Sequence, residues 1–521
     1  MAKPLLVEYE RELVVRTAGA LPVVAALCER LGVVEAVDRF CPIRELADYS
    51  HGQVVLALVC NRLTHPRPLS SFSDWGERYA VAETLGVAPV KLNDDRLGRT
   101  LDALAEHVDE ILNLIGRRVI ERFGISLAEL HWDLTDLRFT GSYSEQDERF
   151  PQVKKGRTPE RTIVRQVKAG HWLSRDGALP LTGRSFDGNQ GDPNAVEPAL
   201  ARLDALRAGL AVQQPAPLVV GDSKLLSAAN VLAFQRRGLR FCCPHPKDAP
   251  LKCRLAALEA HDFQPLAYRP QRQKRDEPRY LAQAGELELA GHSLRALFVL
   301  SLDDQEAARA QRERQWTRLQ DELRSLNGGV PRYTKTAAQL EHKATAKIEQ
   351  RGLTGLVRLA IDDHAGKPQA KIDRDEQAIA EAMRADGRYC LVSNDHELSA
   401  DELFAAYKRQ HLIENRFRDW KGPLAVRPIF LHNNQRIAAL VAIISIALLL
   451  YGLIERQVRH GLAALNERER RLLSQRIGHA TGRKILDQLS DLVTIRSRDG
   501  PAKLAQPRPV QQLLLRLLDP T

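Results

Sequence analysis

The sequence predicts a mixed α/β fold (α+β or α/β), in which a mixed sheet flanked by helices lies between a helical N-terminal domain and a helical C-terminal tail. Apolar residues recur at helical spacing up to about residue 125, and from residue 127 they alternate with polar ones, as in a strand with one buried face. A short apolar run at 218–220 then ends in Gly-Asp before a helix, as strands of α/β sheets do. The chain of 521 residues is long enough for roughly two to four domains.

The composition favours a soluble protein that binds nucleic acid. The net charge is +10 and the isoelectric point is about 9.3, which favours a polyanionic partner over a membrane, with a merely basic enzyme as the alternative. Seven cysteines, an odd number without a C-x-x-C pair, suit a reducing compartment. Because the N-terminus does not resemble a signal peptide, we expect a cytoplasmic protein.

Residues 1–125 are expected to form a helical N-terminal domain. Apolar spacing predicts helices over 21–38, 52–63 and 102–123. A small helical domain ahead of a basic enzyme is a candidate for binding DNA ends, although no helix-turn-helix pattern is visible.

Asp133 lies on the polar face of the first predicted strand, which covers residues 127–135. The apolar phase slips at Thr135-Asp136, which predicts a bulge or bend there. A second strand is predicted over 163–173. An Asp on a solvated edge strand gives the same pattern, so Asp133 alone does not define a site.

Asp222 lies at the carboxyl end of another predicted strand, Leu218-Val219-Val220, and a helix is predicted over 223–237. The carboxyl ends of sheet strands are where α/β folds build their sites. A turn or cap residue is the alternative reading of this Asp. The loop 188–193 is expected to lead into a helix over 194–208.

An inserted module of mixed β and helical structure is predicted over 240–385. Alternating segments at 240–243, 280–289 and 293–302 predict strands, and 304–326 predicts a highly charged helix. The predicted sheet domain therefore consists of 126–239 and 386–455. The remaining tail, 456–521, is expected to be helical, and after Ile454 it holds 13 Lys or Arg against seven Asp or Glu.

Glu414 lies on a helix predicted from Ser399, where Ser-x-x-Glu forms a capping box, to Lys421. At 100° per residue, Tyr407, Gln410, Glu414 and Lys421 fall on one face, with Arg418 on the same rim. A surface helix with ordinary ion pairs is the alternative. The 18 uncharged residues from Ile437 to Ile454 predict a buried helix, with a membrane span as the alternative.

Asp133, Asp222 and Glu414 thus come from three different elements that can converge at one edge of a sheet. Hard divalent cations such as Mg²⁺ prefer carboxylate ligands and keep positions open for water and phosphate. Two such ions can activate a water and stabilise the leaving oxygen in phosphodiester cleavage.

The spacing around Glu414 also carries a family resemblance. Tyr407-x2-Gln410-x3-Glu414-x6-Lys421 resembles the Tyr-x2-Arg-x3-Glu-x6-Lys signature of DDE insertion-sequence transposases. The sequences around the acids, between them and on either side of the signature helix are similar to that group as well: His131-Trp132-Asp133-Leu134-Thr135, Gly188-Asn189 with Asp192, Val219-Val220-Gly221-Asp222, Asp386-Gly387-x-Tyr389-x-Leu391-x-Ser393-Asn394 and Arg427-Pro428-Ile429.

This resemblance implies an RNase H-like catalytic domain whose β-rich insertion separates the second Asp from the Glu. It implies that Asp133, Asp222 and Glu414 are catalytic and hold two Mg²⁺ ions, with Mn²⁺ as a substitute. DNA contacts are expected from the residues of the signature helix, namely Tyr407, Gln410, Arg418 and Lys421.

The implied function is that of a bacterial DNA transposase. A homodimer would bind the terminal inverted repeats of its element, cleave the strands there and transfer them to target DNA, associating with the nucleoid when bound. One position departs from the signature, because Gln410 replaces an Arg and cannot neutralise charge. The alternative is therefore a weakened or inactive DNA-binding protein derived from a transposase.

Overall fold

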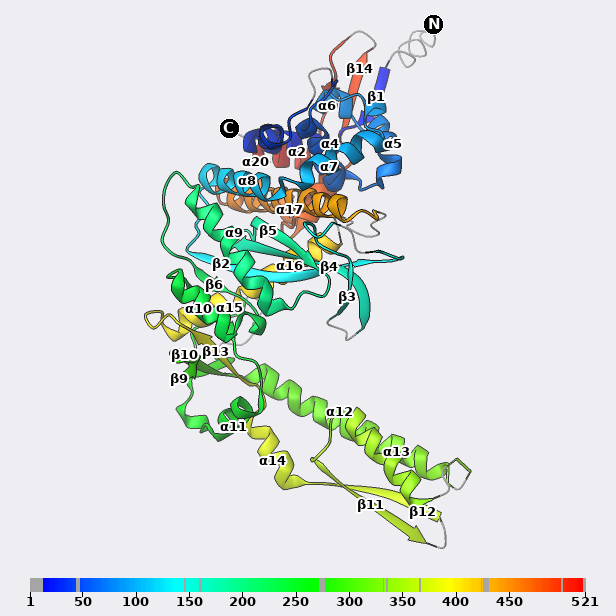
Figure 1. Ribbon diagram of the computed structural model, residues 1–521, viewed down its shortest axis with the longest axis vertical. Helices are drawn as coiled ribbons and strands as arrows, with labels where there is room; N and C mark the ends of the chain where they lie inside the picture. Colours follow the sequence, from blue (N-terminus) through cyan, green and yellow to red (C-terminus); the bar gives the residue numbers. More distant parts are fainter. Residues whose placement is uncertain are drawn as a thin grey trace. The chain divides into compact units, whose positions relative to one another are not determined.

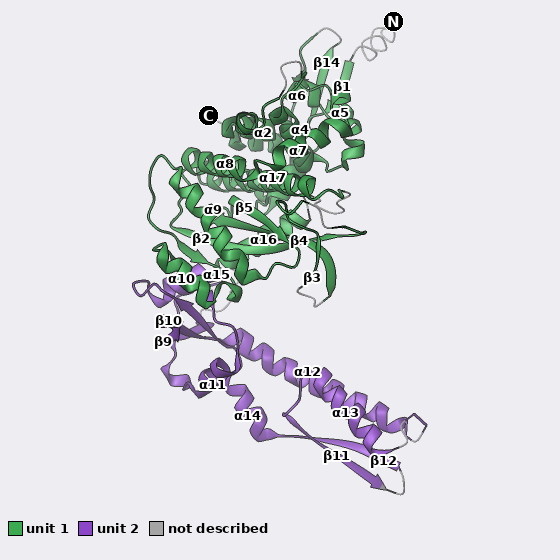
Figure 2. Ribbon diagram, viewed as in Figure 1, with its two compact units in different colours: residues 1–240, 408–521 green, residues 241–407 purple. Residues whose placement is uncertain are grey.

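The computed structural model describes residues 13–43, 47–144, 147–158, 162–270, 277–330, 332–333, 336–364, 367–422, 424, 431–497 and 500–518. The chain forms two compact units (Figure 2). Unit 1 contains residues 1–240 and 408–521, and unit 2 contains residues 241–407.

The N-terminal part of unit 1 is mainly helical, as predicted, but its helices are shorter. They are α2 (Leu21–Leu31), α3 (Val33–Phe40), α4 (His51–Thr64), α5 (Phe72–Arg78), α6 (Val81–Leu85), α7 (Asp94–Ala105) and α8 (Val108–Phe123), with single turns η1 (Leu69–Ser71) and η2 (Pro89–Lys91). The helix predicted over 21–38 is interrupted because Gly32 adopts a left-handed conformation with φ of 61°. The helix predicted over 102–123 likewise divides between α7 and α8.

A mixed sheet forms the middle of unit 1. Its strands are β2 (Glu129–Phe139), β3 (Lys154–Arg157), β4 (Ile163–Ser174), β5 (Pro180–Asp187) and β6 (Leu218–Val220). Strand β4 pairs antiparallel with β2, β3 and β5, whereas β6 pairs parallel with β2. The mixed α/β architecture with a sheet flanked by helices is therefore as predicted.

The bulge predicted at Thr135-Asp136 is absent from the pairing of β2 with β4. The register runs without interruption from Leu130 opposite Ser174 to Phe139 opposite Arg165. The apolar phase changes because both faces of the strand are covered, so that buried apolar residues lie on either side: Trp132 packs on Trp172, whose indole N–H donates to helix α9 (Val196–Ala208).

Helix α17 (Asn434–Gly461) is the central helix of unit 1. It contacts α4, α7, α8 and β5, and Figure 1 shows it running between helices α4 and α7 and the sheet. Among the described residues it is the one helix with the length and apolar composition of a membrane span, and its apolar window is entirely buried inside the protein. The segment Ile437–Ile454 is thus a buried helix, as predicted.

The remaining elements of unit 1 include a second small sheet. Unit 1 also contains three single turns and four further helices: η3 (Asp192–Ala195), η4 (Ser223–Leu225), η6 (Leu462–Ala464), α10 (Ala228–Arg236), α18 (Glu467–Ile477), α19 (Gly482–Leu489) and α20 (Pro509–Leu518). Strands β1 (Leu13–Thr17), β14 (Val493–Ser497) and β15 (Lys503–Leu504) pair in the order β1-β14-β15. The sequence patterns predicted only helices in both of these regions.

Unit 2 has a sheet and a helical arm. The sheet order is β7-β13-β10-β9-β8, formed by β7 (Arg240–Pro244), β8 (Gln264–Pro265), β9 (Tyr280–Leu289), β10 (His292–Ser301) and β13 (Arg388–Ser393). Two helices, α12 (Leu302–Gly328) and α13 (Ala337–Gln350), pack on the hairpin β11 (Val357–His364) and β12 (Lys367–Arg374). The other elements are α11 (Ala249–Ala257), η5 (Ala260–Asp262), α14 (Glu376–Arg384) and α15 (Ala400–Lys408).

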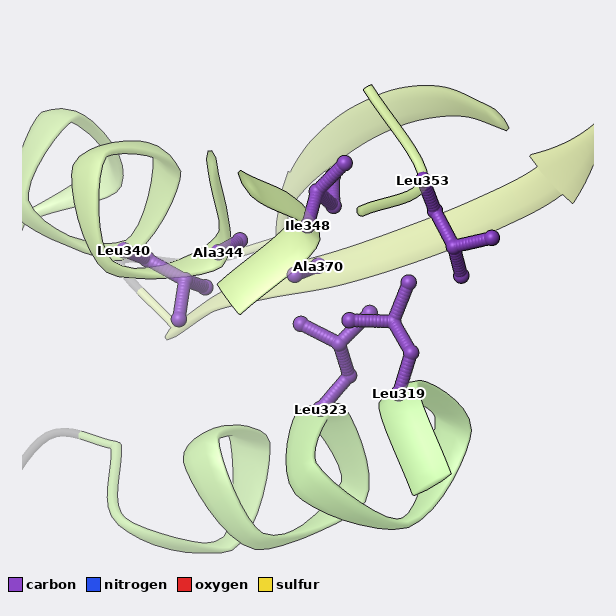
Figure 3. Close-up of a cluster of buried hydrophobic side chains, with 7 residues drawn as sticks. All are labelled: Leu319, Leu323, Leu340, Ala344, Ile348, Leu353 and Ala370. Carbon is purple, nitrogen blue, oxygen red and sulfur yellow. The ribbon is translucent and has the colours of Figure 1, made fainter. Parts of the chain in front are cut away.

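The arm has a hydrophobic core of its own. Its buried side chains come from both helices, the connection between α13 and β11, and the hairpin (Figure 3): Leu319, Leu323, Leu340, Ala344, Ile348, Leu353 and Ala370. The long charged helix predicted over 304–326 therefore has one buried stripe, at Leu319 and Leu323, and is otherwise solvated.

Candidate active site

Strands β2 and β6 bring Asp133 and Asp222 together. Their parallel register places His131 opposite Val220, the last residue of β6, and Asp133 and Asp222 each follow that pair by two residues. The Asp133 carboxylate accepts a hydrogen bond from the Leu134 amide at 2.8 Å. The Asp222 carboxylate caps η4 by accepting from the Lys224 amide at 3.0 Å. Both side chains line one small pocket.

Burial and the charge of Asp222 disfavour the ionisation of Asp133. Burial, the negative charge of Asp222 and that of Glu414 raise the pKa of Asp133 from 3.8 to about 7, against the opposing effects of the Leu134 amide and the Lys224 ammonium. The pKa of Asp222 is also raised, chiefly by burial. The charges of Asp222 and Glu414 both act on Asp133, and of these two acids only Asp222 lines the same small pocket as Asp133.

Glu414 lies on α16 (Gln410–Lys421), and the single helix predicted from Ser399 to Lys421 is wrong. The capping box exists, because Ser399 and Glu402 exchange hydrogen bonds at 2.8 and 3.2 Å and start α15. The helix is interrupted at Arg409, after which α16 begins. Tyr407 therefore belongs to a different helix from the other residues of the signature, and to unit 2.

The first turn of α16 is fixed to β2 by a buried polar network. Gln410 Oε1 lies 2.9 Å from His131 Nδ1, and His131 Nε2 lies 3.1 Å from Glu129 Oε1. Arg409 binds both carboxylate oxygens of Glu129 at 2.5 Å. Although burial alone would raise it, the hydrogen bonds from His131 and Arg409 lower the pKa of Glu129 from 4.5 to about 2. This network fixes the start of the helix that carries Glu414.

The second half of α16 is fixed by a buried arginine and by packing. Arg416 donates to the carbonyl oxygens of Gly177 at 2.8 Å and Ala178 at 3.3 Å. Its guanidinium also lies 3.5 Å from Glu455 of α17. Trp420 packs edge-on against His171 with ring centroids 5.1 Å apart. Both ends of the helix are thus held on unit 1.

The predicted DNA-contacting residues differ in exposure. Arg418 is exposed on α16, as is Glu414. Lys421 is bound to Asp136 at 3.1 Å, and Tyr407 is half-buried with its ring centroid 6.2 Å from that of Tyr389. Gln410, by contrast, is only 9% exposed and its amide oxygen faces His131. Its expected phosphate contact remains a prediction, as do those of the other three; Arg427-Pro428-Ile429 lies outside the described residues.

Sequence reasoning missed several polar residues around the acids. Lys168 and Lys224 both bind Asp192, which lines the same pocket as Asp133 and Asp222. Asp192 was recognised only as part of a loop resemblance, without a role. The signal for Lys224 was its position two residues after Asp222, in the turn that the Asp caps.

The donor set fits a divalent cation in part. Across the described ranges, no three His, Cys, Asp or Glu side chains lie close enough together to hold an ion by themselves. Mg²⁺ in phosphate-handling sites is, however, commonly bound through one or two carboxylates, with waters and substrate phosphate completing its shell. Asp133 and Asp222 are two adjacent hard oxygen donors whose mutual repulsion a cation would relieve.

Comparisons with known proteins give three findings. Residues 13–116 match a family model described as a domain of unknown function, DUF4277. No similar protein is found among the curated proteins. Among solved structures, the chain is similar to piggyBac transposase in the cryo-EM structure of its synaptic complex with hairpin DNA. That similarity covers 89% of this chain and 82% of the other, with 11% sequence identity and a TM-score of 0.38, and at this score it does not define the fold.

Proposed function

We propose that this protein is a DNA transposase that cleaves and transfers DNA strands by metal-dependent phosphoryl transfer. The observation that carries the proposal is that Asp133 and Asp222 line one small pocket and that the charge of Glu414 acts on Asp133, although these acids come from a strand, a strand end and a helix far apart in the sequence. The same three residues are the acids to which the resemblance to DDE transposases points. An RNase H-like catalytic domain is part of this proposal, and the antiparallel β2-β4-β5 strands with β6 parallel to β2 support it.

The chain's own groups have distinct roles in this proposal. Asp133 and Asp222 would hold a divalent cation, and Glu414, exposed on the adjacent helix, would complete the site for a second cation. Bound Mg²⁺ or Mn²⁺ would activate a nucleophilic water or DNA 3′-hydroxyl and stabilise the leaving oxygen. Arg418, exposed one turn beyond Glu414, would contact the DNA phosphates.

The proposal is tested by excision of a marker flanked by the DNA that surrounds the gene, in cells that produce the wild type or a variant. Glu414→Gln and Asp222→Asn should abolish excision while end binding, measured by gel shift, is retained. Glu467→Gln is the matched control, since Glu467 is an exposed glutamate on α18 in the same unit. Wild-type levels of excision by Glu414→Gln would refute the role of that residue.

A gel assay separates the transposase from a DNA-binding protein without catalysis. The purified wild type should nick or cut the flanking DNA only when Mg²⁺ or Mn²⁺ is added, and Asp222→Asn should not. Binding of the ends without cleavage under any divalent cation would favour the non-catalytic alternative.

A further inference from the structure

Asp192 lies between two lysines beside the carboxylate pair. It is at the start of η3, and its side chain is only 15% exposed. One carboxylate oxygen binds the ammonium of Lys168 from β4, and the other binds the ammonium of Lys224. The Lys168 ammonium also donates to the Gln190 carbonyl at 2.7 Å. One carboxylate in the loop between β5 and α9 therefore binds two lysine ammonium groups.

Both acids of the pair, Asp133 and Asp222, are close enough to Lys224 for its charge to act on them. Asp192, Lys224, Asp133 and Asp222 line the same small pocket. Lys224 is the more exposed of the two lysines, because its side chain is 58% exposed whereas that of Lys168 is 16% exposed. A lysine ammonium is a compact charge on a flexible four-carbon stem, so a nearby unpaired carboxylate can capture it. If Asp192 did not hold Lys224, Asp133 and Asp222 would be its neighbouring acceptors in that pocket.

We propose that Asp192 is a positioning residue that binds Lys224, as well as Lys168, and prevents Lys224 from pairing with Asp133 or Asp222, so that this pair stays open to a divalent cation. An ammonium paired with Asp133 or Asp222 occupies a carboxylate oxygen and repels the cation through Coulomb interaction at a few ångströms. Asp192 prevents that pairing, since it supplies each lysine with its own acceptor, while the charge of Lys224 still acts on Asp133 and Asp222 from a distance. This inference rests on the proposed function, because it concerns the same carboxylate pair.

The inference is tested by direct binding of Mn²⁺ to the purified full-length protein, followed as loss of the free Mn²⁺ signal in electron paramagnetic resonance. Asp192→Asn should weaken Mn²⁺ binding by about tenfold or more. Lys224→Gln should strengthen it, and Asp192→Glu should restore it to near the wild-type value. Asp187→Asn is the matched control: Asp187, the last residue of β5, binds Lys154 at 3.2 Å and does not line the pocket of Asp133 and Asp222, so this change should leave Mn²⁺ binding unchanged.

A background without either lysine separates positioning from a general charge effect. In Lys168→Gln/Lys224→Gln, the further change Asp192→Asn should alter the Mn²⁺ affinity by less than about twofold. A full tenfold loss in that background would overturn the inference, because Asp192 would then act through its own charge. Normal binding by Asp192→Asn alone would overturn it as well. Absence of Mn²⁺ binding by the wild type would instead refute metal binding in the proposed function, and this inference with it.

Discussion

Lowering the pH should destabilise unit 1 through His171, a buried neutral histidine on β4. Burial lowers the pKa of His171 from 6.5 to about 4, and its side chain is 2% exposed. Its Nε2 lies 2.8 Å from Ser445 Oγ, which itself donates to the Val441 carbonyl. The imidazole therefore donates from Nε2, and its Nδ1 has no hydrogen-bond partner among the described residues. Protonation would create a buried N–H without an acceptor, beside the rings of Phe417 and Trp420.

The size of the effect follows from the two pKa values. The unfolded chain takes up this proton below pH 6.5, whereas the folded protein resists it until about pH 4. Stability from the neutral imidazole is therefore complete above pH 6.5, falls as the pH drops toward 4 and changes no further below that. The gap corresponds to about 3 kcal/mol of unfolding free energy.

The assay is urea unfolding between pH 7 and pH 4, followed by tryptophan fluorescence. Four of the five tryptophans (Trp75, Trp132, Trp172 and Trp420) lie in unit 1, so the signal reports that unit. His171→Gln keeps a donor for Ser445 but does not titrate, so its pH dependence should be smaller than that of the wild type by about 3 kcal/mol. His479→Gln, on an exposed imidazole, controls for the loss of a histidine. Equal pH dependence of wild type and His171→Gln would refute the reasoning.

Three further predictions concern α16 and DNA. Gln410→Arg restores the residue of the family signature, but it should destabilise the protein by about 2–4 kcal/mol in a thermal melt, because it buries a second guanidinium beside His131 and Arg409. The control Arg418→Gln, on the exposed face of the helix, should cost less than about 0.5 kcal/mol in the same melt. The stability contributed by Glu129 is complete above its unfolded pKa of 4.5 and is lost as the pH falls to about 2, so Glu129→Gln should remove about 3 kcal/mol of pH dependence in that window, measured by acid titration of circular dichroism. The affinity for the flanking DNA should fall steeply between 50 and 200 mM salt in a fluorescence-anisotropy titration, as phosphate contacts require; a flat response would argue against a DNA partner.

The sequence was sufficient to place the acids on their elements but not to describe their supports. The sequence predicts strand β6 at its observed bounds, with Asp222 just after its end, because a short apolar run followed by Gly-Asp is compatible with few structures other than a buried strand and a turn. The strand carrying Asp133 was also predicted, but the burial of both of its faces was not. Apolar spacing reports burial, and a strand covered on both sides changes phase without any irregularity in its backbone.

The partners of these acids could not be predicted, since they depend on pairs far apart in the chain. Glu129 and Arg409 are both charged residues that periodicity assigns to a solvated face, yet they meet in a buried network with His131. The helix is interrupted at Arg409 without a glycine or proline in the sequence there, so the break could not be predicted. Gln410 therefore read as a defect in a DNA-binding signature, whereas the structure places it as a buried partner of β2.

The pairing of β1 with β14 has a practical consequence for dissecting this protein. Leu13 lies opposite Ser497, so the first described strand of the chain has its neighbour in the basic tail. Helices α19 and α20 also pack on α17 in the middle of the unit. Removing residues 456–521 would therefore unpair an N-terminal strand and uncover the central helix, and a truncated protein that failed to bind DNA would reveal only misfolding. Charge-neutralising substitutions within the intact chain are the way to test whether the tail binds DNA.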